Sequence, residues 1–100
     1  ELPFIPKECS HNGHMFYIKV KDIEVRQKLI NHLKQKKIGT AFHYVPLHTS
    51  LGGVKFGRFA GEDIFTTINS EKLLRLPMFY GLLTTEVKQI CAAINSFFES

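Results

Sequence analysis

The chain has 100 residues, which is the size of one domain, and 44% of them are apolar. Its net charge is +4, and no apolar run approaches the roughly 18 residues needed to cross a bilayer. The two cysteines, Cys9 and Cys91, lie far apart in unrelated contexts, and nothing about them suggests a disulfide framework. We therefore expect a soluble, cytoplasmic domain with no membrane partner.

The amino-terminal part of the chain predicts an extended lead-in and a first strand. Residues 1–13 contain two prolines and end in a turn sequence. Residues 14–20 are rich in aromatic and β-branched side chains, which favour a strand. Because side chains alternate along a strand, one face of this strand would carry the core residues Phe16, Ile18 and Val20.

Residues 22–36 predict a helix that follows this strand. Asp22 can cap the helix, because its carboxylate can accept the free amide hydrogens of the first turn. Val25, Leu29 and Leu33 recur at helical spacing and form an apolar stripe. We expect this stripe to face the core while the charged residues of the helix face water.

The middle of the chain predicts a short strand and then a long loop. The strand covers residues 40–44 and ends before Pro46, because proline cannot donate to a sheet ladder. Residues 47–65 fit neither a strand period nor a helical period, and four glycines alternate there with phenylalanines: Phe56, Phe59 and Phe65. Since three phenylalanines on one loop should not all face water, we expect this loop to contact a partner surface.

The last third of the chain predicts a helix at residues 67–74, a brief strand at 74–77 and a final helix that Thr84 caps. Cys91 falls among the apolar residues of the final helix, where we expect a buried thiol. Three strands and two main helices, each with one apolar face, predict an α/β fold. More specifically, residues 1–100 would form a single α+β two-layer sandwich, with helices packed on a small, mainly antiparallel sheet.

Simple metal and nucleophile patterns are weak in this sequence. His43 and His48 are separated by a strand end and a proline, and no cysteine pair or glutamate supports them, so we expect no metal site. Cys9 lies near His11 and His14, but nothing supplies a base or an oxyanion hole. We therefore expect this part to be a flexible exposed segment.

One segment does suggest a site, namely residues 43–48 (HYVPLH). The second strand would deliver a histidine, a tyrosine and another histidine to the mouth of the long loop. These side chains either contact a ligand or form an amphipathic strand end at the rim of the core. Both interpretations stay open, because tyrosine and histidine can bury an apolar body while their polar tips stay hydrated.

The same segment carries a family resemblance. Residues 39–40 (GT), 43–48 (HYVPLH) and 74–79 (LRLPMF), followed by a capped helix, resemble the carboxy-terminal domain of the DegT/DnrJ/StrS aminotransferases. Residues 11–17 (HNGHMFY) and 61–67 (GEDIFTT) are also similar to members of that family. The similarity covers almost the whole chain, and the ordered set of segments is more specific than any one of them.

This resemblance implies a fold and an activity. Members of the family are fold-type I pyridoxal-phosphate enzymes that aminate nucleotide-linked keto sugars, and this chain would be the small carboxy-terminal domain of one. The parent enzyme would transfer an amino group from glutamate to a dTDP-4-keto-6-deoxyhexose in cell-surface polysaccharide biosynthesis. It would act as a homodimer.

The resemblance also implies roles for parts of the chain. The large domain of the parent would supply the Schiff-base lysine and most phosphate contacts, so this chain alone would hold no pyridoxal phosphate and no catalytic residue. Tyr44, His48 and His43 would help to form the nucleotide-sugar pocket. The loop at residues 47–65 would lie against the large domain or the partner subunit.

Two positions depart from the family pattern. Lys37 stands where relatives often have glycine, at a left-handed position after the first helix. Arg75 stands where many relatives have serine, so we assign it no role in binding the amino donor.

The sequence begins at Glu1 with no initiator methionine and no basic-then-apolar leader, and we expect Glu1 to be an internal residue of a longer protein.

Two other functions remain possible at this point. A stand-alone ferredoxin-like ligand-binding module would fit the alternation of strands and helices, and it would need a fourth strand in residues 51–66. A small basic nucleic-acid binder is suggested only by four lysines, which are Lys28, Lys34, Lys36 and Lys37. Because no aromatic residues are interleaved with these lysines, we expect a solvated helix face and no nucleic-acid partner.

Overall fold

The computed structural model describes residues 1–100 and contains one three-stranded sheet with four α-helices. The elements follow in the order β1 (Phe16–Lys19), α1 (Ile23–Gln35), β2 (Ala41–Phe42), the 3-10 helix η1 (Leu47–Thr49), α2 (Leu51–Phe56), α3 (Thr66–Lys72), β3 (Leu73–Leu76) and α4 (Thr84–Glu99). Strand β3 is central and pairs antiparallel with both β1 and β2. The predicted two-layer sandwich with a small antiparallel sheet is confirmed.

The hydrophobic core joins one face of the sheet to helices α1 and α4. Leu74 of β3 is fully buried, and the strand register places it between Ile18 of β1 and Phe42 of β2. The predicted stripe of α1 is confirmed, because Leu29 and Leu33 are also fully buried. The core cluster consists of six residues: Ile18, Val20, Leu29, Leu33, Leu74 and Ala93.

Helix α1 begins at the predicted cap. The Asp22 carboxylate accepts a hydrogen bond from the Val25 N–H at 2.9 Å. We expect Asp22→Ala to lower the free energy of unfolding by about 1 kcal/mol, because an amide hydrogen of the first turn loses its partner. Urea unfolding measures this loss. Glu24→Ala, which removes an acidic residue from the same turn without removing the cap, is the matched control and should cost less; an equal cost would contradict the capping role.

Helix α1 ends in a Schellman motif. The Ile38 N–H donates to the Leu33 carbonyl, and the Lys37 N–H donates to the Lys34 carbonyl, both at 2.9 Å. Lys37 has a φ of 62°, which is the left-handed conformation that favours glycine. The predicted left-handed position is therefore confirmed, and it turns the chain back toward β2.

Helix α4 differs from the prediction at two points. Thr84 is its first residue and not its cap, because Leu83 takes the cap position and donates its N–H to the Glu86 carboxylate at 2.8 Å. The prediction that Cys91 is buried was wrong, since its thiol is exposed. Successive helical residues are about 100° apart, and α4 turns Ile90 toward the core and Cys91 away from it.

The prediction that Phe16 belongs to the core was wrong, because this residue is 39% exposed, and the other differences concern where elements begin and end. Strand β2 has two residues where five were predicted, and β3 and α3 each start one residue earlier than predicted. The prediction that residues 47–65 form a loop throughout was wrong in part, because η1 and α2 lie within them. The sheet has three strands, and α2 occupies the segment where a ferredoxin-like module would need a fourth. That alternative is therefore not favoured.

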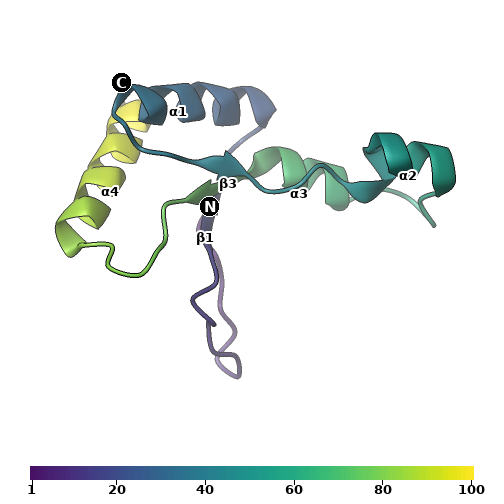
Figure 1. Cartoon of the computed structure of the whole chain (residues 1–100), viewed down its shortest axis with the longest axis horizontal. Helices are drawn as coiled ribbons and strands as arrows, with labels where there is room; N and C mark the ends of the chain where they lie inside the picture. The colour runs from purple at the N-terminus through teal and green to yellow at the C-terminus, as the bar shows by residue number, and fades with distance from the viewer.

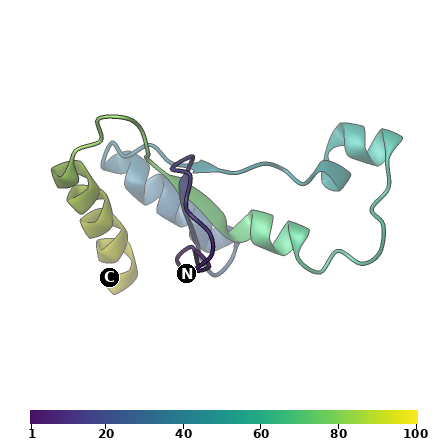
Figure 2. The ribbon, with the colours of Figure 1, turned by 90° about the horizontal axis from the view of Figure 1, so that it is seen from below.

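Residues 43–65, which we call the arm, project away from the sheet. Figure 1 and Figure 2 show the chain running from β2 out to α2 at the far end and returning through α3 to β3. The radius of gyration is 15.8 Å, compared with about 13 Å for a compact domain of this length. The arm therefore leaves Phe56 and Phe65 largely exposed, at 82% and 73%. None of the helices has the length and apolar character that crossing a membrane requires.

Candidate functional site

A proline and a serine shape the outgoing part of the arm. The Pro46 carbonyl accepts hydrogen bonds from the N–H groups of Thr49 and Ser50, both at 3.1 Å, which closes the 3-10 turn of η1. The Ser50 hydroxyl oxygen then accepts the Gly53 N–H at 3.0 Å and caps α2. These local bonds place His48 on η1, beyond the extended segment that follows β2.

Tyr44 and His43 lie at the base of the arm. Their rings meet edge to face with centroids 4.6 Å apart, and the Ser70 hydroxyl of α3 donates to the Tyr44 carbonyl at 3.1 Å. Both residues line a hollow of about 570 Å³, the Tyr44 pocket, to which Asn69 and Ser70 add polar groups. The Tyr44 side chain is 71% exposed. The pocket can therefore offer an aromatic face and several hydrogen-bonding groups to a ligand.

His48 belongs to a hydrogen-bonded cluster with Asp63 and Thr67. Its Nε2 lies 2.7 Å from Asp63 Oδ2 and 3.5 Å from Thr67 Oγ1. Thr67 donates to the Asp63 carboxylate twice, through its backbone N–H at 3.1 Å and through its hydroxyl. The His48 and Asp63 side chains are only 17% and 25% exposed. The cluster therefore fastens the outgoing part of the arm to its returning part.

This cluster should make the arm sensitive to acid. Hydrogen bonds from the Thr67 hydroxyl and backbone N–H lower the pKa of Asp63 below its ordinary value of 3.8. His48 also lowers this pKa, whereas desolvation raises it to a smaller extent than the Thr67 bonds lower it. Because the folded pKa is the lower one, the carboxylate stabilises the arm above the unfolded pKa. That stabilisation is lost as the pH falls through the folded value.

We therefore expect the arm to open below pH 3.8 while the sheet stays folded. Hydrogen exchange of the Thr67 N–H, corrected for the intrinsic effect of pH, measures this opening. Asp63→Asn should abolish the acid step and leave the exchange of the Leu74 N–H unchanged. A wild-type Thr67 amide that exchanges equally slowly on both sides of the step would contradict the prediction.

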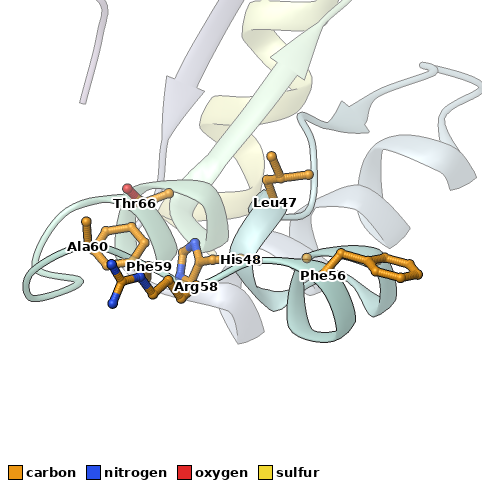
Figure 3. Close-up of a pocket in the computed structure, with 10 residues that line it drawn as sticks. Leu47, His48, Phe56, Arg58, Phe59, Ala60 and Thr66 are labelled. Atoms are coloured by element: carbon orange, nitrogen blue, oxygen red, sulfur yellow. The ribbon is translucent and has the colours of Figure 1, made fainter.

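A second hollow, of about 560 Å³, lies within the arm itself, and we call it the arm pocket. Figure 3 shows His48, Arg58 and Phe59 gathered in it, with the Phe56 ring pointing away. The His48 and Phe59 rings are 4.4 Å apart between centroids. Arg58 forms no ion pair within the chain, so its charge is available to an anionic ligand.

The three predicted site residues do not share one pocket. His43 and Tyr44 line the Tyr44 pocket, whereas His48 lines the arm pocket. Leu47 and Thr66 border both pockets and so connect them. The sequence analysis did not single out Asp63, Thr67 or Arg58, which lie 10 or more residues beyond His48. No local spacing could have revealed them, because the returning part of the arm brings them back to η1.

The chain offers limited means to hold a cofactor or a metal. No lysine lines either pocket of the arm. Lys19 forms an ion pair with Glu1 at 3.0 Å, and the ammonium group of Lys55 lies 5.0 Å from the centre of the Phe56 ring. No group of three or more His, Cys, Asp or Glu side chains is placed to hold a metal ion. The linings of the two arm pockets therefore do not fit a cofactor that bonds to a lysine.

Comparison with known proteins gives the chain a family. The model of the DegT/DnrJ/EryC1/StrS aminotransferase family matches residues 1–95. The UDP-4-amino-4-deoxy-L-arabinose–oxoglutarate aminotransferase of Shewanella sediminis (strain HAW-EB3) is 30% identical over 96 aligned positions, and the match covers 88% of this chain and 25% of that protein. The chain thus spans about a quarter of the length of this curated relative. The chain belongs to the DegT/DnrJ/EryC1/StrS aminotransferase family.

Proposed function

We propose that this chain is the carboxy-terminal small domain of a pyridoxal-phosphate-dependent sugar aminotransferase, in which Tyr44, His48 and His43 contribute to the substrate pocket. The observation that carries the proposal is the arm, which holds these residues next to apolar surface that the chain does not cover. Phe56 borders the arm pocket, and both Phe56 and Phe65 are exposed. A large cofactor-binding domain, or the partner subunit of a homodimer, would cover this surface.

The proposed reaction transfers an amino group from glutamate to the keto carbon of a dTDP-4-keto-6-deoxyhexose. Two similarities support it. Residues 11–17 and 61–67 resemble dTDP-4-amino-4,6-dideoxygalactose transaminase, an enzyme of enterobacterial common antigen synthesis. The Shewanella relative is named for a nucleotide-linked amino sugar and for oxoglutarate, which is the keto acid formed when glutamate gives up its amino group. The product would serve the synthesis of a cell-surface polysaccharide.

The chain's own residues would bind and orient the sugar nucleotide. Pyridoxal phosphate supplies the stabilisation of the carbanion when it is bound, and the large domain would provide the lysine that this chain does not place at either pocket. Tyr44 would offer its ring and hydroxyl, and His48 would offer a ring nitrogen. The exposed arm would be desolvated when the large domain covers it, which would strengthen these polar contacts.

Substitutions in the enzyme that contains this chain test the proposal. We expect Tyr44→Phe and His48→Gln each to lower kcat/KM for the dTDP-keto sugar about 10-fold or more, because each removes a hydrogen bond to the substrate. Release of oxoglutarate from glutamate measures the rate. The matched control is His14→Gln, which changes an exposed histidine just before β1 and should have no effect. Unchanged kcat/KM in both site variants would contradict the proposed pocket.

The isolated chain provides a second test. We expect it to leave the visible absorbance of pyridoxal phosphate unchanged and to transfer no amino group, since the proposed lysine lies in the large domain. Appearance of the absorbance of a lysine-bound cofactor would overturn this division of roles.

A further inference from the structure

We infer that Asp63 is the positioning residue for His48 and that, with Thr67, it fixes the tautomer in which His48 presents Nδ1 to the substrate as a hydrogen-bond acceptor. The inference rests on the proposed function only in naming the substrate. Its structural part concerns three side chains that come from η1, the returning part of the arm and α3.

The contacts at Nε2 determine where the proton of the ring lies. An ionised carboxylate can only accept hydrogen bonds, and Asp63 Oδ2 is 2.7 Å from His48 Nε2. Nε2 must therefore carry the hydrogen. The Thr67 hydroxyl donates its own hydrogen to Asp63, so its oxygen is left to face Nε2 at 3.5 Å as a second, weaker acceptor. Both neighbours of Nε2 favour the same tautomer.

The other ring nitrogen is left free. Nδ1 of His48 has no hydrogen-bond partner within the chain. The buried side-chain atoms without a partner are Arg26 Nε, Thr40 Oγ1 and His43 Nδ1, so Nδ1 of His48 is not a buried atom. It is therefore accessible to solvent, on a side chain that is otherwise only 17% exposed. In a neutral imidazole with Nε2 protonated, Nδ1 carries a lone pair and can only accept.

The packing of the ring keeps this nitrogen in place. Phe59 lies against the His48 ring at a centroid distance of 4.4 Å, and Asp63 is itself held by two hydrogen bonds from Thr67. A ring that packs against Phe59 and is hydrogen-bonded at Nε2 has little freedom to rotate. His48 in its neutral form would thus select a donor group, such as a sugar hydroxyl, and the phosphate oxygens of the nucleotide would be left to a cation such as Arg58.

Nitrogen NMR of the histidine rings tests the structural part directly. The chain is labelled with 15N-histidine and studied at a pH of about 8.5, where an ordinary imidazole is neutral. We expect His48 to show a protonated Nε2 and an unprotonated Nδ1, and His48→Gln assigns its signals. Asp63→Ala should lower the ratio of the two tautomers about 10-fold, because the bond to a charged acceptor is lost. Asp63→Asn keeps an oxygen acceptor and should have a smaller effect.

Two other histidines serve as internal controls. His14 has an exposed side chain without a partner and reports the averaged tautomers of a free ring. His32 bonds the Ala93 carbonyl through Nε2 at 3.0 Å between α1 and α4, so unchanged His32 signals show that the core of each variant is folded. If the His48 pattern matches that of His14, or persists in Asp63→Ala, the inference is wrong.

Enzyme kinetics then separate this inference from the proposed function. We expect Asp63→Ala to raise KM for the keto sugar about 10-fold with a smaller change in kcat, and the double variant with His48→Gln to be no worse than His48→Gln alone. Such non-additivity shows that Asp63 acts through His48. A tautomer change without any change in KM would support the positioning of His48 and contradict its role in binding the sugar.

Discussion

Leu74→Ala should lower the free energy of unfolding by about 2–5 kcal/mol, the largest effect that we expect from any substitution in the chain. Leu74 is fully buried on the central strand and lies between Ile18 and Phe42 in the register of the sheet. Its removal would leave a cavity that touches the sheet and helix α1 together. A domain of this size has a small stability margin, so a large share of the molecules would unfold.

Urea unfolding followed by circular dichroism measures this loss. The matched control is Leu83→Ala, because the Leu83 side chain is 61% exposed and loses little buried surface. We expect the control to change the free energy of unfolding by no more than about 0.5 kcal/mol. Equal losses for the two leucines would show that the sheet is not the centre of the folded chain.

Gly53→Ala should open the arm without unfolding the sheet. A Cβ atom built on Gly53 overlaps the backbone carbonyl of Leu47 and lies 2.6 Å from its carbonyl carbon. Backbone cannot move aside as a flexible side chain can, so η1 and α2 must separate. Overpacking of this kind costs about 1–3 kcal/mol, which corresponds to an increase of about 5-fold to 160-fold in the hydrogen exchange of the α2 amides.

The neighbouring glycine is the matched control for this prediction. A Cβ atom on Gly52 would meet nothing within 4 Å, and alanine favours a helix more than glycine by about 1 kcal/mol. Gly52→Ala should therefore slow the exchange of the Val54 and Gly57 amides, whereas Gly53→Ala speeds it. In the enzyme, Gly53→Ala should also lower kcat/KM, because it displaces η1 and with it His48. If the two variants change the exchange rates of the α2 amides in the same direction, the contact between Gly53 and Leu47 is not as described.

The sequence was most informative where a local pattern and the core agree. The stripe of Leu29 and Leu33, the cap at Asp22 and the left-handed residue at Lys37 each depend on neighbours within a few positions. The structure confirms all three. The number of strands and the antiparallel character of the sheet were also predicted, whereas the order of the strands in the sheet was not.

The differences arise where distant residues decide the outcome. Helix α2 begins because Ser50 caps it. Gly52 and Gly53 disfavour a helix and add no apolar side chain to a helical pattern, so the sequence did not predict α2. The exposure of Cys91 depends on which side of α4 meets α1, which the spacing of apolar residues left open. The bond between His48 and Asp63 joins positions 15 apart in the sequence, and only the return path of the arm creates it.

The way the arm is attached has a consequence for how such proteins can diversify. The arm leaves from β2 and its chain returns through α3 into β3, and these two strands are hydrogen-bonded to each other, so both ends of the excursion are anchored at neighbouring points of the sheet. Insertions or deletions between these anchors would lengthen or shorten the arm at small entropic cost and leave the pairing of β2 with β3 intact. Evolution could thus exchange one ligand-contacting segment for another on an unchanged scaffold.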